Sequence, residues 1–128
     1  MSATRWTLTA LGVLGGALGV LGVVAPDRSL DAAGFEPVAD RAPGDHTLTI
    51  LRSSSLAALS EGGLSVLGAT LGWRLFPAQA VAHRLLLAAD MVGQAATGRG
   101  PRSLLRGAAW EGVGAAAIGA AMWFDHRR

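Results

Sequence analysis

The stretch LRGAAWEGVGAAAIGAAMWF, residues 105–124, is long enough to cross a bilayer as a helix and carries an acidic residue, Glu111, well inside it. Two further apolar stretches, residues 53–73 and 78–97, show the same pattern around Glu61 and Asp90. A carboxyl group in hydrocarbon is costly, so one in each of three segments calls for a functional explanation. The pattern predicts an integral membrane protein with a polar site inside it.

The composition agrees with a membrane protein and narrows the functional classes. The chain has 128 residues, which is the size of one domain, and its 16% charged residues fall below the roughly 25% of ordinary soluble domains. All eleven basic residues are arginines, and no basic run is interleaved with aromatics, which disfavours nucleic-acid binding. The absence of cysteine excludes disulfides and thiolate chemistry.

The apolar segments predict an all-α fold, an integral membrane antiparallel four-helix bundle that forms a single domain over residues 1–128. A short connection around Leu75 and a glycine–proline turn at 98–102 predict tight antiparallel neighbours. Arginines lie on both sides of the expected membrane, so the positive-inside rule favours neither orientation. The expected elements are helices at about 6–25, 47–73, 78–97 and 103–124, and an extramembrane loop at 26–46.

The first span has two features that allow alternative interpretations. Arg5 followed by an apolar run resembles a cleaved signal peptide, although Pro26 directly after Ala25 disfavours cleavage there. Small residues four apart, such as Gly12 and Gly16, let helix backbones approach closely. This glycine-rich face predicts packing against a neighbouring helix of the same chain, with a homodimer as the alternative.

The long connection is rich in proline and glycine, which predicts a solvated loop and excludes a long helix. Its apolar residues Leu30, Phe35 and Val38 suggest an alternative, in which the segment folds back as a lid over a site.

The three acidic residues are expected to lie at one depth. In an antiparallel hairpin, residues equidistant from the turn share a level, and Glu61 and Asp90 are equally far from the turn at Leu75. Asp90 and Glu111 are likewise equidistant from the turn at residues 98–102, so all three should fall within about 3 Å of one layer. Helical phase then points all three toward a common interior.

A cluster of this kind suits acid/base chemistry. Three carboxyls in one dry layer cannot all be ionised, and an acid beside a carboxylate supplies both a proton donor and a proton acceptor. We therefore predict Glu61, Asp90 and Glu111 as catalytic residues. The expected substrate-binding residues, which would orient substrate or water or stabilise a cation, are Ser54, Ser65, Gln94 and Trp110.

Each of these residues also has a structural interpretation. Glu61 and Glu111 could hydrogen-bond neighbouring helices, and Asp90 could be the counter-ion of Arg84. His83 is expected about 10 Å from the acid layer, near a membrane face, and outside the site. No metal-ligand spacing is present, and the chemistry requires no cofactor.

From the second span onward the chain resembles the DoxX-like group of small four-helix bacterial membrane proteins. The residues that carry the resemblance are Glu61-Gly62-Gly63, Gly68, Trp73-Arg74-Leu75-Phe76-Pro77, Arg84 and the Gly98–Pro101 turn, within residues 48–124. The resemblance implies a multi-pass protein of a bacterial cytoplasmic membrane. Small multidrug transporters are similar in size, but their essential glutamate lies in a first helix, which carries no charge here.

The prediction for function is a membrane-embedded acid/base enzyme acting on a lipophilic small molecule, by epoxide opening or hydration, cyclisation or isomerisation. A proton-coupled small-molecule exporter is one alternative. A non-catalytic membrane subunit, held to a larger complex by its acidic residues, is another.

Overall fold

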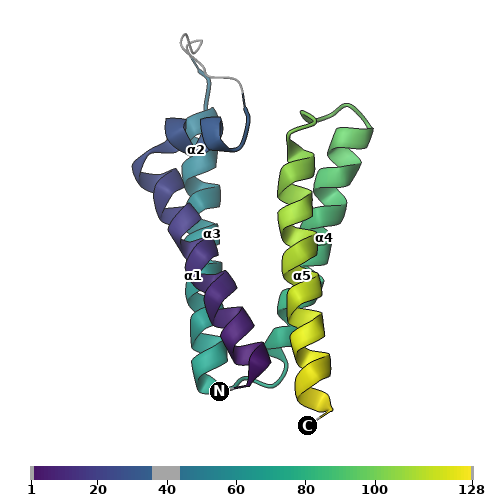
Figure 1. Ribbon diagram of the computed structural model, residues 1–128. Helices are drawn as coiled ribbons and strands as arrows, with labels where there is room; N and C mark the ends of the chain where they lie inside the picture. Colours follow the sequence, from purple (N-terminus) through teal and green to yellow (C-terminus); the bar gives the residue numbers. More distant parts are fainter. Residues whose placement is uncertain (1, 36–43, 128) are drawn as a thin grey trace.

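A computed structural model of the chain describes residues 2–35 and 44–127. Within these residues all regular secondary structure is helical, which confirms the all-α class. The long helices run alternately up and down, and a short helix lies at the end of the first (Figure 1). The helices are α1 (Ala3–Val24), α2 (Pro26–Ala32), α3 (Thr47–Leu71), α4 (Phe76–Ala96) and α5 (Leu104–His126).

The segment expected as a plain loop begins with helix α2. Pro26 starts this helix, where its fixed φ suits the first turn, and Gly34 follows the helix with a φ of 77°, a conformation that favours glycine. Leu30 is buried, as the fold-back interpretation predicted. Val38 lies outside the described residues. The short helix therefore folds back over the ends of α1 and α3 (Figure 1).

Helices α1 and α3 pack closely through glycine. A Cβ atom placed on Gly62 would lie 2.5 Å from the Gly12 carbonyl oxygen and 2.7 Å from the Gly16 nitrogen. A Cβ atom on Gly19 would lie 2.6 Å from the backbone nitrogen of Leu59. The glycine-rich face of α1 is therefore used within the chain, and a second copy would have to bind another face.

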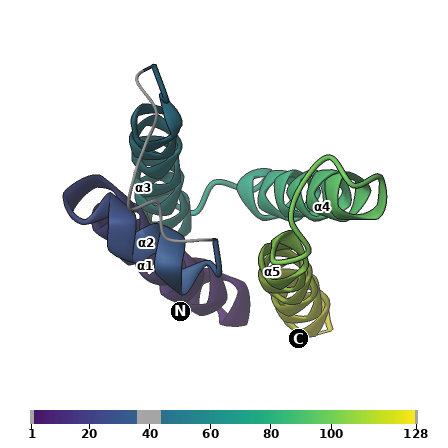
Figure 2. The ribbon, with the colours of Figure 1, turned by 90° about the horizontal axis from the view of Figure 1, so that it is seen from above.

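Helices α3 and α4 do not form the tightly packed hairpin that the short connection predicted. They diverge, while α1 lies beside α3 and α5 lies beside α4 (Figure 2). The small-residue face of α3 is already covered by α1, because Gly62 and Ser65 face Gly12. The result is two antiparallel helix pairs, α1 with α3 and α4 with α5, rather than a closed four-helix bundle.

The two helix pairs meet at the end of the molecule that holds both termini (Figure 1). Leu8, Ala69, Ala80 and Ile118, one from each long helix, form the buried core there. Asp125 at the end of α5 accepts hydrogen bonds from the backbone N–H groups of Ala3 (2.9 Å) and Thr4 (2.8 Å). The Arg5 guanidinium donates to the carbonyl oxygens of Ala69 and Thr70. The first turn of α1 thus joins the ends of α3 and α5.

The contacts of Asp125 predict a pH dependence of stability. Hydrogen bonds from Thr4, and to a smaller extent from Ala3, lower the pKa of this carboxyl from 3.8 to about 2. A carboxyl whose pKa is depressed by folding stabilises the fold above its unfolded value, and this stabilisation is lost as the pH falls toward the folded value. Asp125→Asn should therefore lower the thermal unfolding midpoint at pH 7, and its difference from the wild type should shrink between pH 3.8 and about 2. A difference in unfolding midpoint between the two proteins that stays constant over this pH window would contradict the prediction.

Among the described residues, only α1 combines the length and hydropathy of a membrane-crossing helix. A signal sequence near an N-terminus has the same properties. The other three long helices contain charged residues that lower their hydropathy, including Arg52 and Glu61 in α3, Asp90 in α4 and Arg106 in α5.

Candidate functional site

A cavity of about 230 Å³ lies between the two helix pairs and is lined in part by charged and polar side chains. Its charged lining residues are Glu61 of α3, Arg84 of α4 and Glu111 of α5, and Ser65 and Trp110 also line it. The remaining lining residues are small or apolar: Leu11, Gly12, Gly15, Leu18, Ala58, Gly62, Met91 and Gly107. Two of the three predicted carboxyls therefore meet at one cavity.

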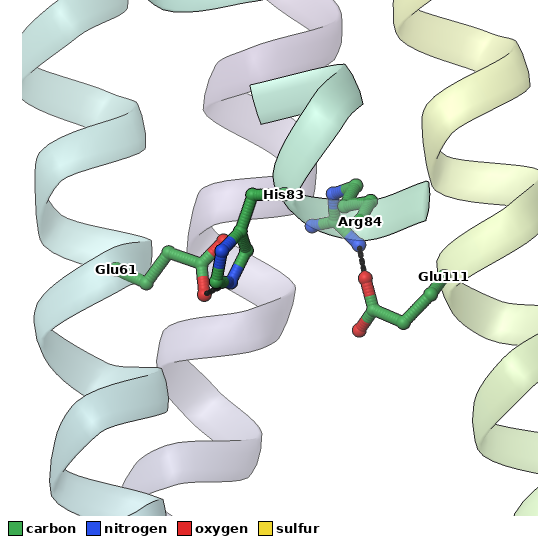
Figure 3. Close-up of polar contacts among 4 residues, drawn as sticks. All are labelled: Glu61, His83, Arg84 and Glu111. Carbon is green, nitrogen blue, oxygen red and sulfur yellow. Dashed lines mark hydrogen bonds and ion pairs between the residues drawn. The ribbon is translucent and has the colours of Figure 1, made fainter. Parts of the chain in front are cut away.

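Arg84 and Glu111 form the buried ion pair of this cavity. The Arg84 Nη1 atom donates to the Glu111 Oε2 atom over 2.7 Å, and the two side chains are only 10% and 15% exposed (Figure 3). Gly114, one turn after Glu111, provides the space, since a Cβ atom there would lie 2.8 Å from Arg84 Nη1. The small residues of α5 thus allow an arginine side chain to lie against its backbone.

Glu61 has a different partner, His83, the residue before Arg84. The His83 Nε2 and Glu61 Oε2 atoms are 3.0 Å apart, and both side chains are partly exposed (Figure 3). This contact joins α3 to α4 where their backbones diverge. Adjacent residues of α4 therefore contact the two carboxyls, His83 on the α3 side and Arg84 on the α5 side.

Asp90 does not join the other two carboxyls, which corrects the expectation of three acids in one layer. It is exposed, it accepts a hydrogen bond from the side chain of Gln94 (2.6 Å), and it does not line the cavity. The reason is helical phase, because Asp90 lies about 120° around α4 from the buried Arg84. The alternative in which Asp90 is the counter-ion of Arg84 is also wrong, because Arg84 forms its ion pair with Glu111.

The predicted substrate-binding residues divide in the same way. Ser65 and Trp110 line the cavity with the two glutamates. Ser54 is exposed and absent from the lining, while the neighbouring Ser55 is buried against α1. The Gln94 side chain donates a hydrogen bond to Asp90 and is not part of the cavity lining.

A second, larger cavity of about 360 Å³ adjoins the first. The two cavities share Leu18, Met91, Gly107 and Trp110 in their linings. The lining of the larger cavity also includes Phe35 and residues of α2, as the lid interpretation predicted. The two cavities are thus neighbours: the smaller is lined by Glu61, Arg84 and Glu111, and the larger is mostly apolar with Arg106 and Ser103 in its lining.

The contacts of His83 and Arg84 with the two glutamates were not predicted from the sequence. One signal was available for Arg84: it belongs to the series Ala80, Arg84, Leu87, Met91, whose helical spacing places it on the face that α4 turns inward. No such signal existed for His83. Its contact with Glu61 disagrees with the equal-depth rule, which assumes that α3 and α4 pack side by side as a hairpin.

No protein family, curated protein or solved structure matches this chain. Within residues 2–35 and 44–127, no three histidine or acidic side chains lie close enough to hold a metal ion together. The geometry of the cavity is therefore the basis for assigning a function.

Proposed function

We propose that this chain is a multi-pass membrane protein in which all four long helices cross the bilayer. The exposed surface supports this, because it carries large apolar side chains such as Leu86, Val113 and Ile50 at 64–72% exposure. Trp6, Trp73 and Trp123 are exposed at the end where the two helix pairs meet, as expected for an aromatic belt at the headgroup level. Charged residues in the middle of helices that face a cavity or a partner are typical of functional membrane proteins.

Within this membrane protein we propose an acid/base enzyme that acts on a lipophilic small molecule. The observation that carries the proposal is that Glu61 and Glu111 line one cavity from opposite helices with different partners. Acid/base catalysis needs two groups whose surroundings differ, so that one gives a proton while the other takes one. The partner of Glu61 is an imidazole, whose ring nitrogens can donate or accept a hydrogen bond, whereas the partner of Glu111 is a guanidinium, which only donates.

The cavity suits reactions that move a proton to and from a substrate oxygen or carbon. In epoxide hydration, one group would protonate the ring oxygen as the C–O bond breaks, and the other would take a proton from the attacking water. Cyclisation and double-bond isomerisation need the same two transfers. The Trp110 ring would stabilise positive charge that develops on carbon, and the Ser65 hydroxyl would orient water or substrate.

The structure provides a matched set of variants for the test. We expect Glu61→Gln and Glu111→Gln each to lower turnover by about 10²–10⁴-fold, the usual contribution of a positioned proton-transfer group. Asp90→Asn makes the same chemical change outside the cavity and should leave turnover within about twofold of the wild type. The measurement is diol formation from 1,2-epoxydecane in ¹⁸O-labelled water, with an alkene and a terpenoid polyene as isomerisation and cyclisation substrates. Glutamine keeps an oxygen acceptor for the His83 and Arg84 contacts, which limits structural loss.

If turnover in both glutamine variants equals that of the wild type, these carboxyls have no catalytic role. The exporter or the non-catalytic subunit would then replace the enzyme as the function of this site.

A further inference from the structure

The larger cavity is apolar over most of its surface. Leu18 and Leu21 of α1, Met91 of α4, and Leu104 and Trp110 of α5 form its walls. A cavity of about 360 Å³ lies at the small end of the range for small-molecule sites, which is roughly 300–1,000 Å³. The apolar walls suit one hydrocarbon chain. The volume of the cavity is too small for a two-chain phospholipid.

One end of this cavity is polar and positively charged. Arg106 and Ser103 line it there, and no acidic residue from the described part of the chain belongs to the lining. Within residues 2–35 and 44–127, no residue pairs with the Arg106 guanidinium and none forms a hydrogen bond with the buried Ser103 Oγ atom. A buried hydroxyl without a partner is costly, and rotation of the Ser103 side chain toward a ligand that accepts its hydrogen bond would remove that cost.

The backbone N–H groups at this polar end already have hydrogen-bond partners. The N–H groups of Leu104, Leu105 and Arg106 donate to carbonyl oxygens in the preceding turn. A ligand would therefore bind to the side chains of Arg106 and Ser103 and not to the backbone. Gly34, which follows α2, leaves room for the guanidinium, since a Cβ atom there would lie 3.1 Å from Arg106 Nη1.

We propose that this cavity binds a single-chain lipophilic carboxylate, with its carboxylate at Arg106 and Ser103 and its hydrocarbon body along α1 and α5. The planar guanidinium matches the two oxygens of a carboxylate, and one cation with one hydroxyl suits a singly charged anion. The shared lining residues Met91 and Trp110 would lead the far end of the chain to Glu61 and Glu111. The inference rests on the proposed function and defines its substrate class.

The test uses the full chain in phosphatidylcholine nanodiscs and a decanoic acid that carries bromine at its far end. Bromine quenches tryptophan fluorescence on contact, and Trp110 lies where the two cavities join. We expect saturable quenching that is lost in Trp110→Phe. Arg106→Gln should raise the half-saturating concentration about tenfold, with Arg106→Lys in between, because a charge-assisted contact is lost or weakened.

The matched control is Arg102→Gln. Arg102 lies one turn before Arg106 and faces a different pocket, beside Val92 and Ala96, so its loss should change the half-saturating concentration less than twofold. Brominated decanol should bind more weakly than the acid to the wild type and equally to the wild type and Arg106→Gln. Helical circular dichroism of each variant checks that the fold is intact.

Equal binding by the Arg106 and Arg102 variants, or by the acid and the alcohol, would overturn the proposal. Quenching of Trp110 by brominated phosphatidylcholine that the acid does not displace would also overturn it, because bilayer lipid would then fill the cavity. Arg106-dependent binding in a chain without turnover would keep this site and refute the enzyme. Turnover of 1,2-epoxydecane without binding of the brominated acid would keep the enzyme and refute this carboxylate site.

Discussion

Replacing Arg84 by methionine is expected to lower the free energy of unfolding by about 3–5 kcal/mol, because it leaves the buried Glu111 carboxyl without its partner. Methionine has a similar length and fills much of the same volume. The measurement is the midpoint of thermal unfolding in micelles at pH 7, followed by circular dichroism. Arg102→Met removes an exposed arginine and should have little effect on that midpoint.

A second variant separates loss of the ion pair from loss of packing. In Arg84→Met combined with Glu111→Leu, both charged groups are replaced by apolar ones, and such replacement of a buried pair is often close to neutral. We therefore expect the double variant to recover most of the stability lost in the single one. A double variant as unstable as the sum of the single variants would show that Arg84 and Glu111 contribute independently, contrary to the 2.7 Å contact.

Exchanging Gly62 for alanine should destabilise the pairing of α1 and α3, while the same exchange at Gly63 should not. The new Cβ atom at Gly62 would lie 2.5 Å from the Gly12 carbonyl oxygen, and a backbone atom cannot rotate away. The two helices would have to separate, at a cost of about 1–3 kcal/mol. At Gly63 no atom lies within 4 Å of the new Cβ atom, and alanine should stabilise the helix by roughly 0.5–1 kcal/mol.

The two glycine variants share one helix, one backbone conformation and one chemical change, so their difference reports the contact alone. Unfolding midpoints in micelles measure it, and Gly12→Ala should behave like Gly62→Ala because its Cβ atom would lie 2.7 Å from the Gly62 carbonyl oxygen. Equal midpoints for the Gly62 and Gly63 variants would mean that α1 and α3 are not in backbone contact. The close approach matters for function because α1 and α3 together form one wall of the cavity.

Helical phase predicted some of the site residues and failed for others. It placed Glu61, Ser65, Trp110 and Glu111 on inward faces, and these residues do line the cavity. It also turned Asp90 inward, but the inward face of α4 is set by Arg84 and Met91. The error arose because the inward face of α4 was assigned from its polar residues. The residues of α4 that pack against glycines of α5 are instead Arg84 and Met91.

The distances between helices could not be predicted from the sequence. The equal-depth argument assumes that consecutive helices pack side by side, as they do for α4 and α5. Helices α3 and α4 diverge instead, and His83, expected about 10 Å away in depth, lies 3.0 Å from Glu61.

Local sequence patterns were enough to predict that this chain is all helical, where its long helices lie, and that acidic residues occupy their interiors. Those properties follow from local apolar runs, prolines and glycines, which act within one turn or one segment. Which carboxyls meet follows from the tertiary packing, because it depends on which helix faces fit closely against one another. The glycines of α1 fit α3, and the glycines of α5 accept Arg84 and Met91. These contacts leave Glu61 and Glu111 at one cavity and Asp90 outside it.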